Sequence, residues 1–156
     1  MQTIPPKEES ILGLVIYAPV AHPILFLVGF MVHLLVPVPL SSRGVFVPVG
    51  AVLLLLAPAV ILWSQHTLRR FRSAAATGTL RFAEGPYRLT RNPTYLGLFL
   101  LTLGFAFLAN SLTLTLAAVF SFIIVRAFIV PREERLMEKK YGDSYRTYRD
   151  TVGRWF

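Results

Sequence analysis

Two polar clusters in the second half of the chain hold the side chains best suited to chemistry. The first covers residues 85–97, Gly-Pro-Tyr-Arg-Leu-Thr-Arg-Asn-Pro-Thr-Tyr-Leu-Gly, and the second covers residues 132–136, Arg-Glu-Glu-Arg-Leu. The stretch between them is nearly uncharged and long enough for two membrane crossings. Two crossings return the chain to the side where it started, so we expect the clusters to meet at the mouths of adjacent helices. Ionisable groups are costly against such an apolar wall, and function is the usual reason to keep them.

Asn92 and Pro93 in the first cluster have two interpretations. Asn is a preferred N-cap, and proline at the first helical position loses nothing because its missing N–H would be unpaired there. The pair would then simply start a helix. The same helix start also presents free N–H groups and a positive dipole end, which suit a carboxylate or a phosphate. The sequence leaves both interpretations open.

The paired glutamates of the second cluster also have a structural and a functional interpretation. Acidic residues in the first turn of a helix that follows Pro131 favour its dipole. Adjacent residues differ by about 100° around a helix, so one glutamate can face solvent while the other faces the bundle. An inward carboxylate would bind an ammonium group or pair with an arginine, as Glu134 would with Arg91.

Arg126 lies one turn inside the last hydrophobic stretch. Its long side chain can extend to the membrane surface while its methylene groups stay in the apolar layer. Alternatively, it faces the bundle and holds an anionic group of a substrate, which is the default hypothesis for a charge at this depth.

The composition excludes an ordinary soluble domain, because 54% of the 156 residues are hydrophobic and only 15% are charged. We predict one all-α integral membrane domain, a polytopic protein with about four transmembrane helices, a C-terminal helical hairpin and a cytoplasmic amphipathic tail helix. Residues 1–64 would form the N-terminal helices, with Pro19 and Pro23 separating a short interfacial segment from the first spanning helix. The four apolar stretches cover residues 11–36, 45–63, 95–109 and 112–130.

The net charge of +8 is unevenly distributed, since 13 of the 16 basic residues lie in residues 64–94 or after Val130. The positive-inside rule therefore predicts that the motifs and both termini face the cytoplasm. Anionic headgroups account for this basic surface, so we expect membrane lipids and no nucleic acid as partners. We expect no metal, because cysteine is absent and His22 and His33 lack a further ligand at helical spacing.

The tail after the second cluster carries an aromatic and apolar stripe. Tyr145, Tyr148, Val152 and Trp155 recur at helical spacing, opposite charged residues. Such a helix would lie in the headgroup layer or close over the site as a lid, and the two interpretations are compatible.

Taken in order, these motifs resemble one family of membrane enzymes. The series Gly-Pro-Tyr-x3-Arg-Asn-Pro-x-Tyr-x-Gly, a helical hairpin, the Glu-Glu pair and Tyr-Gly-x-x-Tyr-x-x-Tyr-x3-Val is similar to membrane methyltransferases related to isoprenylcysteine carboxyl methyltransferase and phospholipid N-methyltransferase. The similarity covers residues 79–155. It implies S-adenosylmethionine as the cofactor, residues 65–156 as the cofactor-binding half, and a lipophilic acceptor with a carboxylate, phospholipid amine or thiol group.

The resemblance also implies roles for individual residues. The stretch before the Gly-Pro-Tyr turn would contact the cofactor through its backbone, and Glu133 would hold the amino group of its methionine part. Glu134 would support Glu133 or pair with an arginine, and Arg126 would serve the acceptor. The expected cofactor contacts are Thr79, Leu80, Arg81, Phe82, Tyr87, Asn92, Pro93, Thr94, Tyr95 and Glu133, and the expected catalytic residues are Arg91, Arg126 and Glu134.

The chain departs from this family pattern at two positions. Asn92 stands where a histidine is commoner, and Ile129 stands where the isoprenylcysteine enzymes carry a substrate-binding arginine, with Arg126 one turn earlier. Neither motif holds a histidine, which favours an acceptor that needs little help from a base. Two alternatives stay open: an NADPH-dependent membrane reductase of the sterol-reductase type, which has many more helices than this length permits, and a non-catalytic membrane scaffold.

Overall fold

The computed structural model describes residues 11–76 and 81–155, and within them the side chains of residues 20, 22–71 and 81–155. These residues form helices and connecting loops, as expected for the all-α class. The elements are α1 (Ile11–Leu35), α2 (Val47–Ala76), the short 3-10 helix η1 (Gly85–Arg88), α3 (Pro93–Leu108), α4 (Leu112–Ile124), the π-helical turn η2 (Val125–Ile129), α5 (Val130–Tyr141) and α6 (Asp143–Thr151).

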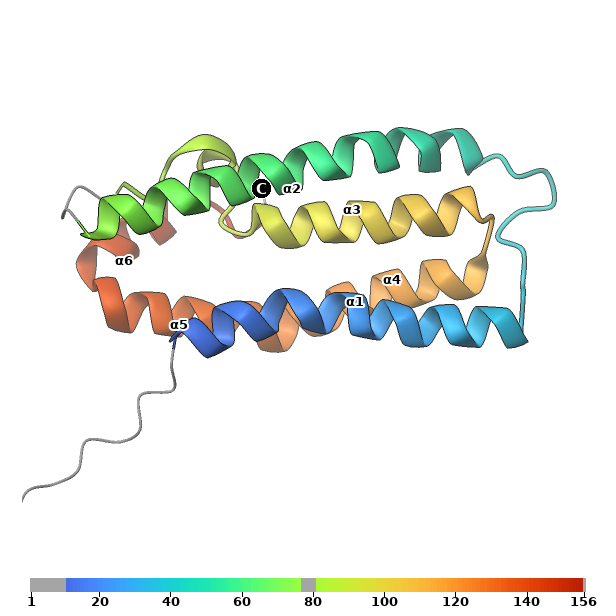
Figure 1. The fold of residues 1–156 in the computed structure, drawn as a ribbon, viewed down its shortest axis with the longest axis horizontal. Coiled ribbons are helices and arrows are strands. Elements are labelled where there is room, and N and C mark those ends of the chain that lie inside the picture. The colour runs from blue at the N-terminus through green and yellow to red at the C-terminus, as the bar shows by residue number, and fades with distance from the viewer. Residues whose placement is uncertain (1–10, 77–80, 156) are drawn as a thin grey trace, which may run out of the picture.

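The long helices lie in two layers (Figure 1). α2 packs along α3 and α1 packs along α4, while α3 and α4 form a hairpin that joins the layers. α4, η2 and α5 follow one another without a break. α6 lies at the end of the bundle where α2 finishes and α1 begins.

Two helices of the described residues are long and apolar enough to cross a membrane, Val47–Phe71 and Leu112–Tyr141. Two further apolar helices, His22–Leu35 and Pro93–Leu108, are shorter. By length and composition the two longer helices could cross a membrane, and the topology with four crossings stays a prediction.

Glycines allow α2 and α3 to lie in close contact. A Cβ atom on Gly97 would lie 2.6 Å from Cγ1 of Ile61, and one on Gly50 would lie 2.6 Å from the backbone nitrogen of Leu108. Small residues serve this purpose in apolar bundles, where helices associate by close packing rather than by escape from water.

The two histidines of α1 make hydrogen bonds to neighbouring helices. Nε2 of His22 lies 3.1 Å from the Thr102 hydroxyl on α3, and Nδ1 of His33 lies 2.9 Å from the Ser111 hydroxyl at the start of α4. Buried polar groups need such partners in an apolar layer, and these pairs fix the position of α1 against the hairpin.

The hairpin between α3 and α4 turns at Asn110 and Ser111, as the sequence predicts. Asn110 has a positive φ of 47°, and its side-chain amide donates to the backbone oxygen of Ser41 at 2.8 Å. The Ser111 hydroxyl caps α4 by accepting the N–H of Leu114 at 3.1 Å. The α1–α2 loop is thereby bound to the hairpin turn.

Two expected helix boundaries are wrong. α1 runs through Pro19 and Pro23 as one helix, without a separate interfacial segment. α2 does not end near residue 64 but continues to Ala76, because the polar residues that follow Trp63 include good helix formers and no glycine or proline. At 30 residues α2 is about 45 Å long, so it extends beyond a hydrocarbon layer of about 30 Å.

A helix begins beside Pro131, as the sequence predicts, but it directly continues the helix before it. The chain passes from α4 through the wide turn η2 into α5, and Pro131 lies in the first turn of α5. A proline costs little in a first turn, and a π-helical turn inserts one residue ahead of it. The second polar cluster therefore sits on a direct continuation of α4, which gives it a defined orientation.

Candidate functional site

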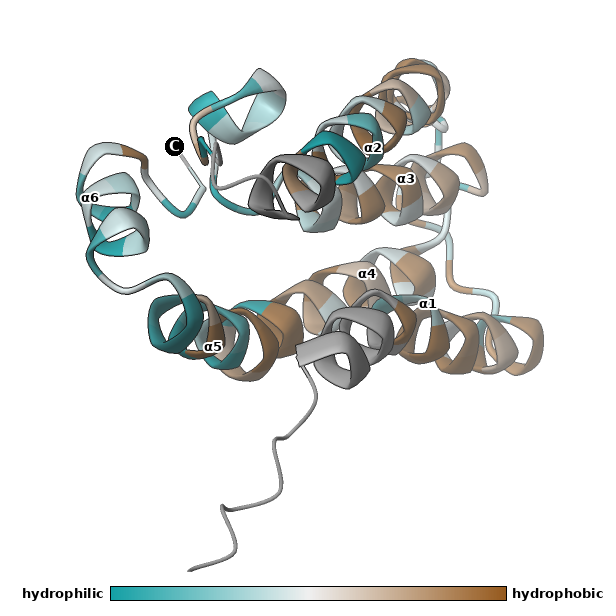
Figure 2. Cartoon of the chain, turned by 60° about the vertical axis from the view of Figure 1, so that its left-hand side comes forward, coloured by the Kyte–Doolittle hydropathy of each residue, from teal (hydrophilic) through white to brown (hydrophobic). Residues whose placement is uncertain are grey.

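A cavity of about 210 Å³ lies at the polar end of the bundle, bounded by the last turns of α2, the start of α3, α5 and α6. Figure 2 shows hydrophilic residues gathered on α5, α6 and the near part of α2, while the remaining lengths of the helices are hydrophobic. The two polar clusters of the sequence meet at this cavity.

The first cluster is held by a sharp turn and a chain of hydroxyl groups. Gly85 has a φ of +53°, and a Cβ atom there would meet Thr67 of α2, so only glycine fits. The Ser64 hydroxyl lies 3.2 Å from the Tyr87 hydroxyl and 2.6 Å from that of Thr94. These contacts tie α2, η1 and α3 together on one wall of the cavity.

Asn92 occupies the N-cap position of α3, but its side chain makes no capping hydrogen bond. The residue is 8% exposed, and its Nδ2 atom is buried without a partner. Its backbone N–H instead donates to the Thr90 hydroxyl at 3.3 Å. Since the side chain lines the cavity and its N–H donors are unused, it is available to a ligand.

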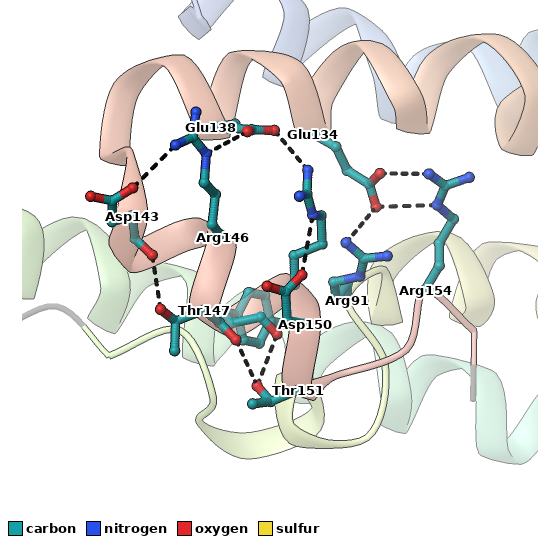
Figure 3. Close-up of polar contacts among 11 residues, drawn as sticks. Arg91, Glu134, Glu138, Asp143, Arg146, Thr147, Asp150, Thr151 and Arg154 are labelled. Atoms are coloured by element: carbon teal, nitrogen blue, oxygen red, sulfur yellow. Dashed lines mark hydrogen bonds and ion pairs between the residues drawn. The ribbon is translucent and has the colours of Figure 1, made fainter.

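Glu134 is neutralised by two arginines, as Figure 3 shows. Nε and Nη2 of Arg154 donate to its two carboxylate oxygens at 3.1 and 2.6 Å. Nη1 of Arg91 lies 3.3 Å from one of these oxygens as an ion pair, without the geometry of a hydrogen bond. The Glu134 side chain is 12% exposed, so the pairing offsets the cost of burying its charge.

Glu133 also lines the cavity, but its hydrogen-bond partners differ from those of Glu134. The Tyr95 hydroxyl donates to its carboxylate at 2.8 Å, and among the described residues no cation forms an ion pair with it. A carboxylate has about four acceptor positions, so most of those of Glu133 are unused. Of the two glutamates, Glu133 is the one that can accept from an ammonium group.

Arg91 provides donors of the opposite kind on the same cavity. Its side chain is 10% exposed, and both Nε and Nη1 are buried without a hydrogen-bond partner. Arg91 and Asn92, whose buried nitrogens have no hydrogen-bond partner, therefore line the same cavity as Glu133. The cavity is therefore complementary to a group that carries both an anion and a cation.

Aromatic rings form another part of the lining. The Phe82 ring stacks on Tyr148 with centroids 5.4 Å apart and meets Tyr145 edge-on at 5.5 Å, and Phe71 packs against Tyr87 at 5.1 Å. Burial raises the pKa of Tyr145 to about 12, against the opposing effect of Arg91, so its hydroxyl stays protonated. These rings provide flat apolar surfaces suited to a planar ring system.

Three residues of the tail stripe are buried against the protein. Tyr145, Tyr148 and Val152 are buried around Phe82, and the Tyr148 hydroxyl donates to the backbone oxygen of Tyr87 at 2.8 Å. α6 thus covers the cavity as a lid. Trp155 is not part of this stripe, because α6 ends at Thr151 and the Trp155 ring packs on Phe122 instead.

The structure brings most of the expected site residues together, but not all. Arg81 and Arg126 are exposed and do not line the cavity, while Thr79 and Leu80 lie outside the described residues. Nine expected residues line the cavity: Phe82, Tyr87, Arg91, Asn92, Pro93, Thr94, Tyr95, Glu133 and Glu134.

Sequence reasoning missed the contributions of α2 and of the last residues. Three residues of α2 line the cavity at a spacing of three: Gln65, Leu68 and Phe71. This spacing places them on one face of a helix, and it could have been noticed if the helix had been expected to continue beyond residue 64. Leu136 and Met137 of α5 line it too. No spacing rule could have paired Arg154 with Glu134, which depends on where the chain goes after α6.

Comparison with known proteins identifies the family of this chain. The model of the phospholipid methyltransferase family matches residues 45–144, from the start of α2 into α6. The chain belongs to the phospholipid methyltransferase family, and is thus a methyltransferase of a membrane-associated class. An uncharacterised protein of Haemophilus influenzae is 39% identical over 62 residues, which are 39% of this chain and 97% of that protein. No solved structure matches the chain.

Proposed function

We propose that this protein transfers a methyl group from S-adenosylmethionine to a lipophilic acceptor at the membrane. One observation supports the cofactor above all others. Unused acceptor positions on Glu133 and unused donors on Arg91 and Asn92 line the same cavity. An α-amino acid group, which ends S-adenosylmethionine, has an ammonium and a carboxylate to match them.

In this proposal Glu133, oriented by the Tyr95 hydroxyl, binds the ammonium group. Arg91 and Asn92 bind the carboxylate, and Glu134 balances the charge of Arg91. Four of the six aromatic residues that line the cavity supply surfaces for the adenine ring: Phe71, Phe82, Tyr87 and Tyr148. Thr79 and Leu80 lie outside the described residues, and their backbone contacts stay a prediction.

Bound S-adenosylmethionine supplies a sulfonium methyl group that is already activated for transfer. The protein therefore has to hold the acceptor in line with that methyl group and exclude water. α6 excludes water, because its buried tyrosines, Tyr145 and Tyr148, close one side of the cavity. The exposed Arg126, on the outer face of η2, is available to an anionic head of the acceptor.

We also propose four crossings, made by α1, α2, α3 and the continuous helix from α4, with the cavity and both termini on the cytoplasmic side. The described chain begins and ends at the same end of the bundle, and Arg43 is the basic residue of the loop at the other end (Figure 1). A lipophilic carboxylate, phospholipid amine or thiol would reach the site from the bilayer. Of these acceptors, the family favours a phospholipid amine.

Calorimetric titration of the detergent-purified protein with S-adenosylhomocysteine tests the cofactor. We expect saturable binding of one ligand per chain. No heat of binding at millimolar ligand would refute the proposal and leave a scaffold as the explanation. Protection of the protein by NADPH instead, in a thermal-shift measurement, would point to a reductase.

A second experiment identifies the acceptor. The protein is incubated in native membranes with S-adenosylmethionine carrying a labelled methyl group, and the lipid and aqueous fractions are separated. We expect the label in an extractable lipid or lipophilic molecule. Label confined to water-soluble products would contradict a lipophilic acceptor while leaving methyl transfer intact.

A further inference from the structure

The last described residues of the chain, 152–155, run along the loop that leads into α3. The backbone oxygen of Gly153 accepts the Arg91 N–H at 3.1 Å, and the backbone oxygen of Arg154 accepts the Thr90 hydroxyl at 2.7 Å. In both bonds the C-terminal segment contributes a backbone oxygen and no side-chain atom. The two bonds hold this segment beside Arg91.

The side chain of Arg154 makes a separate contact with α5. It approaches Glu134 with two nitrogens, one to each carboxylate oxygen, while Arg91 reaches the same carboxylate at a longer 3.3 Å without a hydrogen bond (Figure 3). Bidentate pairs of this kind are the stronger ones. Arg154 is therefore the principal partner of Glu134, and Nε and Nη1 of Arg91 keep no hydrogen-bond partner.

We propose that Arg154 is a positioning residue that keeps Arg91 free to bind the carboxylate of the methyl donor. By occupying Glu134 with its own guanidinium, Arg154 prevents Glu134 from drawing the donors of Arg91 away from the cavity. This inference rests on the proposed function, because it requires a ligand with a carboxylate in the cavity.

The physical argument follows from the burial of Glu134. Without the Arg154 side chain, a carboxylate that is 12% exposed would have Arg91 as its remaining counter-ion. A buried charge that loses one partner is strongly destabilised, so the Arg91 guanidinium would turn to bind it with two nitrogens. Nε and Nη1 of Arg91, which now have no hydrogen-bond partner, would be consumed, while the main-chain bonds at Gly153 and Arg154 would remain.

The test compares S-adenosylmethionine with its decarboxylated form, which keeps the ammonium and sulfonium groups and lacks only the carboxylate. Both affinities are measured by calorimetry on the detergent-purified full chain. We expect the wild-type protein to prefer the carboxylated ligand. Arg154→Leu should weaken its binding by about tenfold, as for the loss of a charge-assisted contact, and change that of the decarboxylated form little. The affinity ratio would then approach one.

Two further variants make the result decisive. Arg154→Lys keeps the charge but loses the bidentate contact. Its affinity ratio for the two ligands should therefore lie between those of wild type and Arg154→Leu. If the leucine variant does not fold, the lysine variant tests the role of Arg154. Arg146→Leu is the matched control, because Arg146 pairs with Glu138 on α5 and does not line the cavity. Its ratio should equal that of the wild type.

An unchanged ratio in Arg154→Leu, whether neither affinity falls or both fall equally, would overturn the role of Arg154, and so would a wild-type ratio near one. In both cases S-adenosylmethionine still binds the wild-type protein, so the proposed function survives. A wild-type protein that binds neither ligand removes the proposed function, and this inference with it.

Discussion

The two ends of the helical bundle treat buried polar groups in opposite ways. At the end formed by the α1–α2 loop and the α3–α4 turn, polar side chains are matched: His33 with Ser111, and the Asn110 amide with both backbone groups of Ser41. At the cavity end, buried nitrogens of Arg91, Asn92 and Trp155 have no hydrogen-bond partner, and these are the residues with such atoms in the described chain. Folding alone explains the first pattern, whereas the second requires a ligand or a cost in stability.

The packing of the two ends differs in the same sense. At the end away from the cavity, Gly50 of α2 and Gly104 of α3 bring the backbones together with no room for another carbon atom. At the polar end, α2 and α5 face each other across a cavity with large aromatic and charged side chains on its walls. The apolar end is packed by direct contact between helices, whereas the polar end leaves a cavity with room for a ligand.

The largest expected effect comes from the charge of Glu133. Glu133→Gln should weaken binding of S-adenosylhomocysteine by tenfold or more, since loss of one partner of a buried charge contact costs about 2–5 kcal/mol and about 1.4 kcal/mol is a factor of ten. Calorimetric titration measures it. Glu138→Gln is the matched control, because Glu138 pairs with Arg146 and Arg149 away from the cavity, and its affinity should stay within about twofold of wild type. Equal losses in both variants would contradict a specific role of Glu133 in binding the ligand.

A smaller effect, on stability alone, is expected at the tightly packed end. Gly50→Val should lower the free energy of unfolding in detergent by about 1–3 kcal/mol, because the new side chain would meet backbone atoms of Gly104 and Leu108. Valine is a better helix former than glycine, so the loss would come from packing. The neighbouring Ala51→Val, on the exposed face of α2, should change unfolding by much less. If both variants behave alike, close contact between α2 and α3 is not what holds this end.

The smallest effect concerns one buried pair between α1 and α3. A double-mutant cycle with His22→Leu and Thr102→Val should give a coupling energy of about 0.6 kcal/mol and no more than about 1.7 kcal/mol, the mean and the maximum for hydrogen bonds between membrane helices. Unfolding of the two single variants and the double variant in detergent measures it. Affinity for S-adenosylhomocysteine should not change, because neither residue lines the cavity. A loss of affinity would mean that the two ends of the bundle are coupled.

Much of the site could be predicted because its motifs are local. Gly85, Asn92-Pro93 and the Glu133-Glu134 pair each define a turn or a helix start from neighbouring residues alone, and the apolar hairpin between the clusters has a fixed length. The sequence could not decide whether the Asn92 side chain caps α3, because a side chain suited to capping can instead point toward a cavity. The structure gives it no capping bond.

The sequence by itself determined the all-helical class, the apolar helices, the hairpin turn at Asn110 and Ser111, and the meeting of the two polar clusters. These follow from periodicity and composition, which act over a few residues. Only the tertiary structure decided that α2 reaches the cavity with Gln65 and Phe71, that Arg126 faces outward, and that Arg154 pairs with Glu134. The physical reason is that burial and ion pairing depend on distances between segments far apart in the chain, which no local pattern encodes.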